Sequence, residues 1–170
     1  CVVVSAAGKT TDTLVSLWQS YQQQDTQAVA DILLQLNNHQ SDLIEQLLQA
    51  DLKRSALKTL LEELNIIASL AQSEQLKEAQ LLAHGELWSA RLLAAYLQQL
   101  NVHACAHDAR LLFTLNDGEL RHAQNKLQCN SVIDANKVNV VTGFIAANTL
   151  GDTVTLGRNG SDYSATLLAS

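Results

Sequence analysis

The sequence is short of basic residues and has no long apolar segment. Its 11 Lys and Arg stand against 17 Asp and Glu, which gives a net charge of −6 and a pI near 5.2. Binding nucleic-acid phosphates needs a basic surface, so we expect no nucleic-acid partner. No run approaches the roughly 18 uninterrupted apolar residues of a membrane span, and nothing resembles a signal peptide, so we expect no membrane association.

Proline and methionine are absent, without an evident physical reason, and only three cysteines occur. Cys1, Cys105 and Cys129 are few, far apart and odd in number, which favours reduced thiols and a cytoplasmic location. The 170 residues fit one domain that buries roughly 70% of its unfolded surface. Because the chain starts directly in the apolar run Val2–Val4, without an initiator methionine, we expect a piece of a longer protein.

The order of the predicted elements indicates an α/β fold with a mostly parallel sheet. Apolar residues keep helical spacing through almost all of residues 13–100, with a glutamine-rich linker after Tyr21, and we take this long segment as a helical insertion. Helical and strand-like segments alternate elsewhere. We predict strands at 2–4, 102–107, 138–142 and 153–156, helices at 120–134 and 163–170, a turn-rich connection at 143–151, and a helix at 86–100.

Three loops follow the predicted strands and form the natural place for a ligand. In parallel sheets, ligands bind at the carboxyl ends of the strands. The loops there are Ser5–Thr11, the segment around Gly143 and Phe144, and Gly157–Asp162. In the first loop, Thr11 or Asp12 is expected to cap the following helix.

The last of these loops has the composition of an anion site. Arg158 lies between two glycines, next to Asn159, and a Ser-Asp pair then opens a helix. Backbone N–H groups at a helix start attract anions, and an arginine can bind a carboxylate or phosphate through two oxygens. A simple turn with Ser161 as N-cap explains the serine but not the arginine, so we favour a binding function.

The residues alone leave two interpretations for each of two other motifs. Gly8-Lys9-Thr10 looks like part of a P-loop, but Val3 stands where that motif requires glycine, so a substrate loop and a plain turn are both compatible with it. His84-Gly85-Glu86 fits a boundary between two helices, and this is the simpler interpretation of Glu86. The alternative makes Glu86 the acceptor for a substrate ammonium group.

The sequence contains no pattern typical of a metal centre or of a catalytic nucleophile. The five histidines lack zinc-ligand spacing, so we expect no metal site in the chain itself. No serine or cysteine lies in a sequence pattern typical of a catalytic nucleophile.

Four motifs together resemble the aspartokinases of the amino-acid kinase superfamily, across essentially the whole chain. They are Val3–Thr10 (VVSAAGKT), His84–Arg91 (HGELWSAR), Val141–Ile145 (VTGFI) and Thr155–Ala165 (TLGRNGSDYSA). The second motif and Asn159 look most like the kinase part of the bifunctional aspartokinase–homoserine dehydrogenases of type II.

This resemblance implies a three-layer α/β sandwich, a partial amino-acid kinase fold, and phosphorylation of the L-aspartate β-carboxylate by ATP with Mg²⁺. The product is 4-phospho-L-aspartate for lysine, threonine and methionine synthesis. By position, Glu86 would bind the aspartate ammonium or organise that pocket, and Arg158 would pair with the α-carboxylate, with Asp162 acting beside Arg158 in catalysis. The other expected substrate-binding residues are Ser5, Thr10, Phe144, Asn159, Gly160 and Ser161.

The resemblance also implies that parts of the enzyme lie outside the chain. The lysine and glycines that hold ATP phosphates in this family should precede Cys1, and any regulatory or dehydrogenase domains should follow Ser170. We therefore expect residues 1–170 to be the substrate-binding part of a catalytic domain, inactive alone and without tightly bound nucleotide, from a homo-oligomeric parent. Two alternatives are a non-catalytic amino-acid-binding module and a helical interaction domain formed by residues 13–100.

Overall fold

The computed structural model describes residues 1–116, 119–120 and 122–169, with side chains outside 117–124. The chain folds into two compact units. The helical unit comprises Ala6–Trp88, and the α/β unit comprises Cys1–Ser5 together with Ser89–Ser170. Helix α4 (Glu78–Gln99) begins in the helical unit and ends in the α/β unit.

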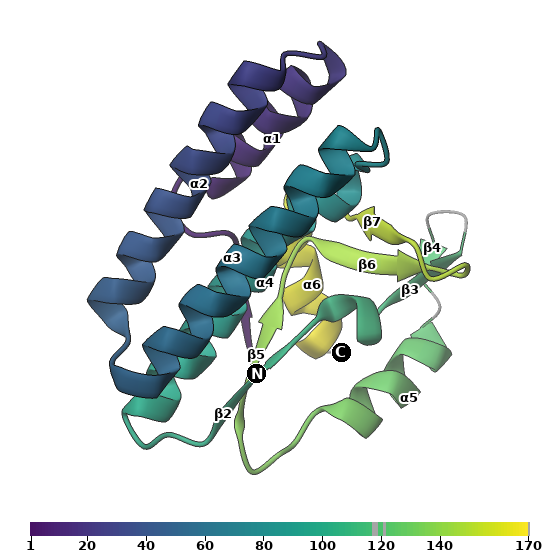
Figure 1. The fold of residues 1–170 in the computed structure, drawn as a ribbon. Coiled ribbons are helices and arrows are strands. Elements are labelled where there is room, and N and C mark those ends of the chain that lie inside the picture. Colours follow the sequence, from purple (N-terminus) through teal and green to yellow (C-terminus); the bar gives the residue numbers. More distant parts are fainter. Residues whose placement is uncertain (117–118, 121, 170) are drawn as a thin grey trace. The chain divides into compact units, whose positions relative to one another are not determined.

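The helical unit contains three long helices before α4 (Figure 1): α1 (Thr10–Gln22), α2 (Thr26–Leu47) and α3 (Ala50–Gln72). Helix α2 packs against both α1 and α3. Asp25 caps α2, since its Oδ1 accepts a hydrogen bond from the Ala28 N–H at 2.9 Å. Apolar residues three and four positions apart bury one stripe of each helix, as the sequence predicts. The core of these helices includes Leu14, Leu17, Leu36, Ile44, Leu60, Leu64 and Ile67.

A three-stranded parallel sheet lies at the centre of the α/β unit, in the order β1 (Val2–Val4), β5 (Val138–Thr142), β2 (Ala104–His107). The second half of α4 packs on this sheet. Ala90 and Ala94 meet Val140, because alanines let the helix backbone approach the β-branched strand residues closely. Val4, Val138, Leu93 and Leu97 complete this cluster.

A second, mixed sheet has the order β4 (Glu119–Leu120), β3 (Thr114–Asn116), β6 (Ile145–Asn148), β7 (Thr153–Thr155). Strands β6 and β7 form a hairpin whose turn is organised by Asn148, whose Oδ1 accepts from the N–H groups of Leu150 and Asp152. Arg110, in the 3₁₀ turn η1 (Ala109–Leu111), pairs with Asp108 and donates to the Thr153 hydroxyl. The remaining helices are α5 (His122–Val132) and α6 (Gly160–Ala169).

The α/β class, the parallel pairing of the predicted strands near residues 2–4, 102–107 and 138–142, and the helical character of residues 13–100 are confirmed. The predicted connection 143–151 is wrong, because it contains β6. The strand at 153–156 is also not part of the parallel sheet, since β7 pairs antiparallel with β6 in the second sheet. Strands β3 and β4 are missing from the sequence prediction, because each is very short.

The predicted helix starts also need correction. Helix α1 begins at Thr10, before Thr11 and Asp12, and Lys9 is its N-cap without a side-chain bond. Helix α6 begins at Gly160, so Ser161 is its second residue rather than its cap. Ser170, the predicted end of this helix, lies outside the described residues.

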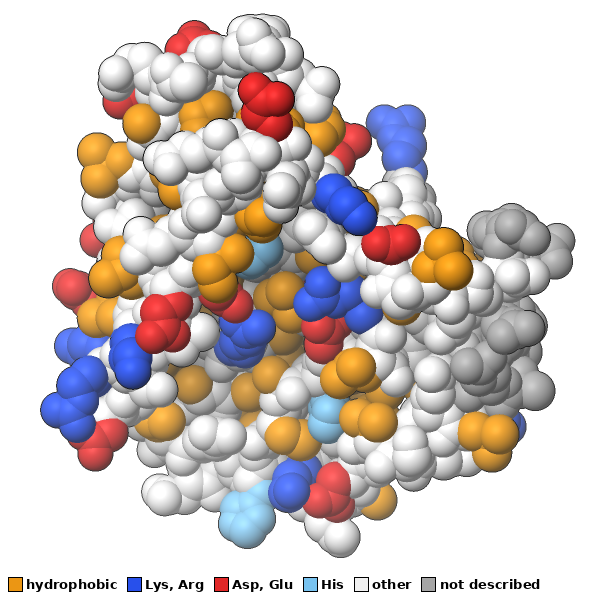
Figure 2. Space-filling view, turned by 45° about the vertical axis from the view of Figure 1, so that its right-hand side comes forward, with side chains coloured by type: hydrophobic (Ala, Val, Ile, Leu, Met, Phe, Trp, Pro, Cys, Tyr) orange, Lys and Arg blue, Asp and Glu red, His pale blue; other side chains and the backbone are white. Residues whose placement is uncertain are grey.

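Surface charge is mixed on the face shown in Figure 2, where Lys and Arg side chains lie among acidic ones. Within the described part of the chain, no helix is both long enough and apolar enough to cross a membrane.

Candidate functional site

Glu86 lies in the interior of the helical unit with only one of its carboxylate oxygens bonded. The residue is 3% exposed. Its Oε1 accepts a hydrogen bond from the Ala6 N–H at 3.3 Å. Its Oε2 is buried, and no donor among the described residues reaches it. A buried oxygen without a partner costs about 1–3 kcal/mol, so this atom is poised to accept a hydrogen bond from a ligand.

Burial also changes the protonation of this side chain. Loss of water raises the pKa of Glu86 from 4.5 to about 7, although the bond from the Ala6 N–H acts in the opposite direction. Near neutral pH the carboxyl group is therefore present in both its protonated and its ionised form. A ligand cation beside Oε2 would favour the ionised form and release a proton.

Gly85 explains how the loop after β1 comes so close to α4. A Cβ atom at position 85 would lie 2.8 Å from the Ala6 Cβ and 3.5 Å from the Leu14 Cδ1. Only glycine leaves room for this contact, which holds the Ala6 N–H near Glu86. The predicted helix boundary at His84–Glu86 is therefore wrong: α4 is continuous through these residues, and Gly85 serves packing rather than helix termination.

Thr10 fixes the far end of the same loop from the first position of α1. It is fully buried, and its hydroxyl donates to the Ala7 carbonyl at 2.6 Å. The same hydroxyl accepts from the Gln40 Nε2 at 2.9 Å. Between Ala7 and Thr10 the chain turns at Gly8, whose φ of +57° suits glycine.

Two further loops pack against each other in the α/β unit. A Cβ atom at Gly143 would lie 2.5 Å from the Ser161 Oγ, and one at Gly160 would lie 3.0 Å from the Phe144 Cδ2. The Gly143 N–H donates to the Val4 carbonyl at 2.8 Å, which places this pair of loops at the carboxyl end of β1. The glycines thus allow the close contact of backbones that the strand-end prediction requires.

Phe144 has a left-handed backbone, with φ of +67°, directly between β5 and β6. This conformation costs a non-glycine residue about 1–3 kcal/mol and is concentrated at functional sites. The neighbouring contacts maintain it, because the Phe144 carbonyl accepts from the Leu156 N–H at 2.7 Å.

The loop before α6 presents groups that can bind an anion. Arg158 and Asn159 are exposed, and no described residue pairs with the Arg158 guanidinium. Asn159 adopts φ of +59°, which asparagine tolerates better than most residues. Helix α6 starts at the next residue, so its first N–H groups and positive dipole end lie beside this arginine.

The structure thus groups the predicted residues in two sets. In the helical unit, Thr10 and Glu86 hold adjacent parts of one loop. In the α/β unit, the other set follows the ends of β1, β5 and β7 and consists of Ser5, Phe144, Arg158, Asn159, Gly160, Ser161 and Asp162.

Sequence reasoning missed Gln40, which is 3% exposed. The sequence nevertheless contains a sign of this residue. Leu36, Gln40 and Ile44 are spaced four residues apart, so a single amide interrupts an apolar stripe.

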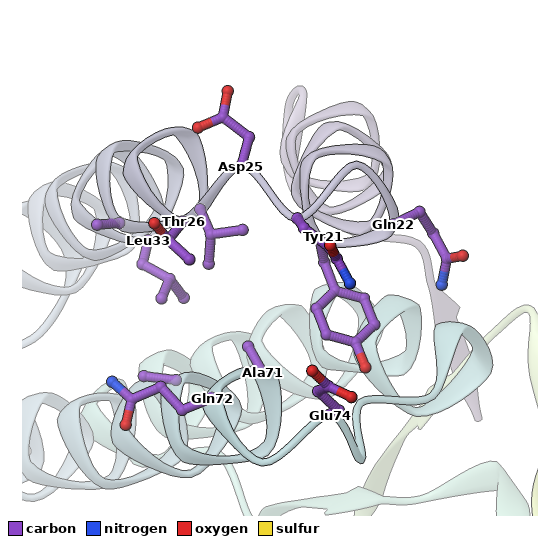
Figure 3. Close-up of a pocket in the computed structure, with 12 residues that line it drawn as sticks. Tyr21, Gln22, Asp25, Thr26, Leu33, Ala71, Gln72 and Glu74 are labelled. Carbon is purple, nitrogen blue, oxygen red and sulfur yellow. The ribbon is translucent and has the colours of Figure 1, made fainter.

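A cavity of about 590 Å³ lies elsewhere in the helical unit, between the end of α1, the start of α2 and the end of α3. Figure 3 shows the Tyr21 ring reaching toward Glu74, while the Asp25 carboxylate points away from α3. None of the predicted site residues lines this cavity. Within the described residues, no three His, Cys, Asp or Glu side chains form a group suited to a metal ion.

We predict that Gly85→Ala destabilises the protein by roughly 1–3 kcal/mol, although alanine is the better helix former. The new methyl group would collide with Ala6 and push the loop off α4. Urea denaturation measures the change, with Ser89→Ala, one turn along the same helix, as control. Equal or greater stability of Gly85→Ala would show that the loop is not tightly packed there.

We predict that Glu86→Gln stabilises the unliganded protein at pH 8 but hardly at pH 4.5. The pKa of Glu86 is raised in the folded state, so its contribution to the free energy of unfolding falls as pH rises from 4.5 to about 7. The loss amounts to about 3 kcal/mol and is absent in the glutamine variant. Urea denaturation at both pH values tests this, with the exposed Glu45→Gln as control; a pH-independent difference between wild type and Glu86→Gln contradicts it.

Comparison with known proteins identifies the family of this chain. Residues 1–170 match the sequence profile of the amino acid kinase family. Bifunctional aspartokinase/homoserine dehydrogenase 2 of Escherichia coli is 38% identical over 180 residues, covering 99% of this chain and 22% of that protein.

Solved structures show the same fold. Aspartokinase III of E. coli, in complex with lysine and aspartate, superposes with a TM-score of 0.83 at 28% identity. The same enzyme in complex with aspartate and ADP gives a TM-score of 0.74 at 29% identity. Each match covers 99% of this chain and 39% of the other, so the chain spans about a fifth to two fifths of the length of these relatives. The predicted resemblance to aspartokinases is confirmed, and the chain belongs to the amino acid kinase family.

Proposed function

We propose that the natural gene product is an aspartate kinase, which transfers the γ-phosphoryl group of ATP to the β-carboxylate of L-aspartate. The product is 4-phospho-L-aspartate, an intermediate for lysine, threonine and methionine synthesis. The observation that carries this proposal is the buried, unpartnered Oε2 of Glu86 in a chain of this family. Support also comes from aspartokinase III of E. coli, two structures of which were solved with aspartate.

Glu86 is proposed to bind the aspartate ammonium group through Oε2. An ammonium group donates three hydrogen bonds and carries the charge that would stabilise an ionised, buried carboxylate. Because Oε1 is already bonded to the Ala6 N–H, the side chain can keep its position while Oε2 accepts the ligand.

Arg158 is proposed to pair with the α-carboxylate of aspartate. It is exposed in a glycine-flanked loop, and its planar guanidinium matches a carboxylate through two parallel hydrogen bonds. Asn159, Gly160 and Ser161 would add neutral donors from the start of α6. Asp162, in the first turn of that helix, would orient the polar groups around Arg158 during phosphoryl transfer.

The remaining predicted residues are proposed to shape the pocket. Phe144 follows β5 and lies against the start of α6, and Ser5 follows β1, whose Val4 carbonyl accepts from the Gly143 N–H. Thr10 already uses its hydroxyl for Ala7 and Gln40, so it would contribute by fixing the loop.

ATP with Mg²⁺ would supply the phosphoryl group. We assign no described residue to the nucleotide, since the family's phosphate-binding lysine and glycines do not match any segment of this chain. The described residues would bind and orient aspartate, and positioning of this kind is a large part of phosphoryl-transfer catalysis. We further propose a cytoplasmic homo-oligomer in which residues 1–170 are the substrate-binding part of the kinase domain. A homoserine dehydrogenase activity of the same gene product is a related proposal, suggested by the bifunctional relative.

The direct test is to incubate the natural gene product with ATP, Mg²⁺ and L-aspartate, and to trap the acyl phosphate with hydroxylamine. We expect the hydroxamate of aspartate to form, and the 170-residue chain alone to form none. Aspartate binding without ATP turnover by the gene product would instead indicate an amino-acid-binding module.

We predict that Arg158→Ala raises the KM for aspartate roughly 30- to 150-fold, which corresponds to about 2–3 kcal/mol for one charge-assisted pair. The KM for ATP should change little. Steady-state kinetics measure both constants, with Arg54→Ala as control, because Arg54 forms an exposed pair with Asp51 on α3. A large change in the KM for ATP with an unchanged KM for aspartate would contradict the role of Arg158.

A further inference from the structure

Gln40 is a buried polar residue within the apolar face of α2. It is 3% exposed and stands between Leu36 and Ile44, both of which are buried. A buried amide costs free energy unless its hydrogen bonds are satisfied, and a leucine or methionine would fill the same space without that cost. An amide at this position therefore needs an explanation beyond the packing of α2.

The hydrogen bonds of Gln40 lead directly to the loop after β1. Its Nε2 donates to the Thr10 Oγ1 at 2.9 Å, and the Thr10 hydroxyl donates its single hydrogen to the Ala7 carbonyl at 2.6 Å. The donor and acceptor roles in these two hydrogen bonds follow from their chemistry. If the amide were reversed, its oxygen would compete with Ala7 for the only hydrogen of the threonine hydroxyl.

The loop is consequently held from two helices at adjacent residues. Gln40 of α2 holds Ala7 through Thr10, while Glu86 of α4 binds the N–H of Ala6. Gly85 makes the second contact close enough to form. A shift of Ala7 would move the Ala6 N–H as well, because one peptide unit joins the two residues.

We infer that Gln40 is a positioning residue for substrate binding: through Thr10 it holds Ala6 and Ala7 so that Glu86 keeps Oε1 engaged and presents Oε2 to the ligand ammonium. The inference rests on the proposed binding of aspartate at Glu86. Gln40 itself touches no substrate. Its action runs through the backbone of the loop.

The kinetic test compares Gln40→Met, which keeps the volume but removes the donor, with Gln35→Met at an exposed position of the same helix. In the natural gene product, we expect Gln40→Met to raise the KM for aspartate about tenfold, as for loss of one buried hydrogen bond. The KM for ATP should stay within about twofold. An aspartate KM within about twofold of wild type for Gln40→Met overturns the inference.

A double-mutant cycle distinguishes this role from general loosening of the fold. If Gln40 acts through Thr10, then Thr10→Val and the double variant should have nearly the same aspartate KM as Gln40→Met, because either change breaks the same chain. Additive effects of Gln40→Met and Thr10→Val would contradict the inference.

A second readout does not depend on kinase activity. If the loop loosens, Glu86 loses the bond from the Ala6 N–H that lowers its pKa, so Gln40→Met should raise the pKa of Glu86 above that of wild type. Titration of ¹³C-glutamate signals, with Glu86→Gln for assignment, measures this shift. An unchanged pKa overturns the positioning role even if the protein phosphorylates aspartate. If wild type forms no phospho-aspartate but the shift occurs, the proposed function fails while the positioning of the loop stands.

Discussion

A buried carboxylate with one bonded and one unbonded oxygen is the constraint on which the helical unit depends. Glu86 receives a single backbone N–H from Ala6, and no described residue supplies a donor to its other oxygen. The arrangement costs stability, because burial holds the pKa of this group near 7. Several features that otherwise look unrelated maintain it. Gly85 admits the loop, the continuous α4 carries the carboxylate into the interior, and Gln40 fixes the loop from α2.

The α/β unit has a complementary chemistry built on close backbone contacts. Gly143 and Gly160 allow two loops to meet, and Phe144 is held in a left-handed conformation between two strands. These contacts leave Arg158 exposed at the start of a helix, where an anion is favoured. A zwitterionic amino acid requires a carboxylate and a guanidinium, and Glu86 and Arg158 are the side chains proposed for these two roles. Aspartate as the ligand is our proposal for that pair, in keeping with the family to which the chain belongs.

The sequence predicts those parts of the fold that follow from local periodicity. Leucine spacing identifies the long helices, and the valine runs identify β1 and β5. Tertiary contacts account for the failures. A glycine within a helix looks like a terminator until Ala6 is known to lie against it, so the continuity of α4 at Gly85 could not be read from spacing. Strand β6 contains small residues and ends in a turn at Asn148, so it resembles a loop. The position of these loops directly after the strands was predictable, whereas the support of one of them by Gln40 depends on a contact between residues 30 positions apart.

The central claim is that the unpartnered oxygen of Glu86 receives the ammonium group of aspartate. Isothermal titration calorimetry of the natural gene product with L-aspartate, at pH 7 in buffers of different ionisation enthalpy, tests it most directly. With a pKa of about 7 before binding, Glu86 should release about half a proton per aspartate bound as it becomes ionised. The release should disappear in Glu86→Gln and decline toward pH 8.5. Aspartate binding with no proton release in wild type, or with the same release in Glu86→Gln, would contradict this account.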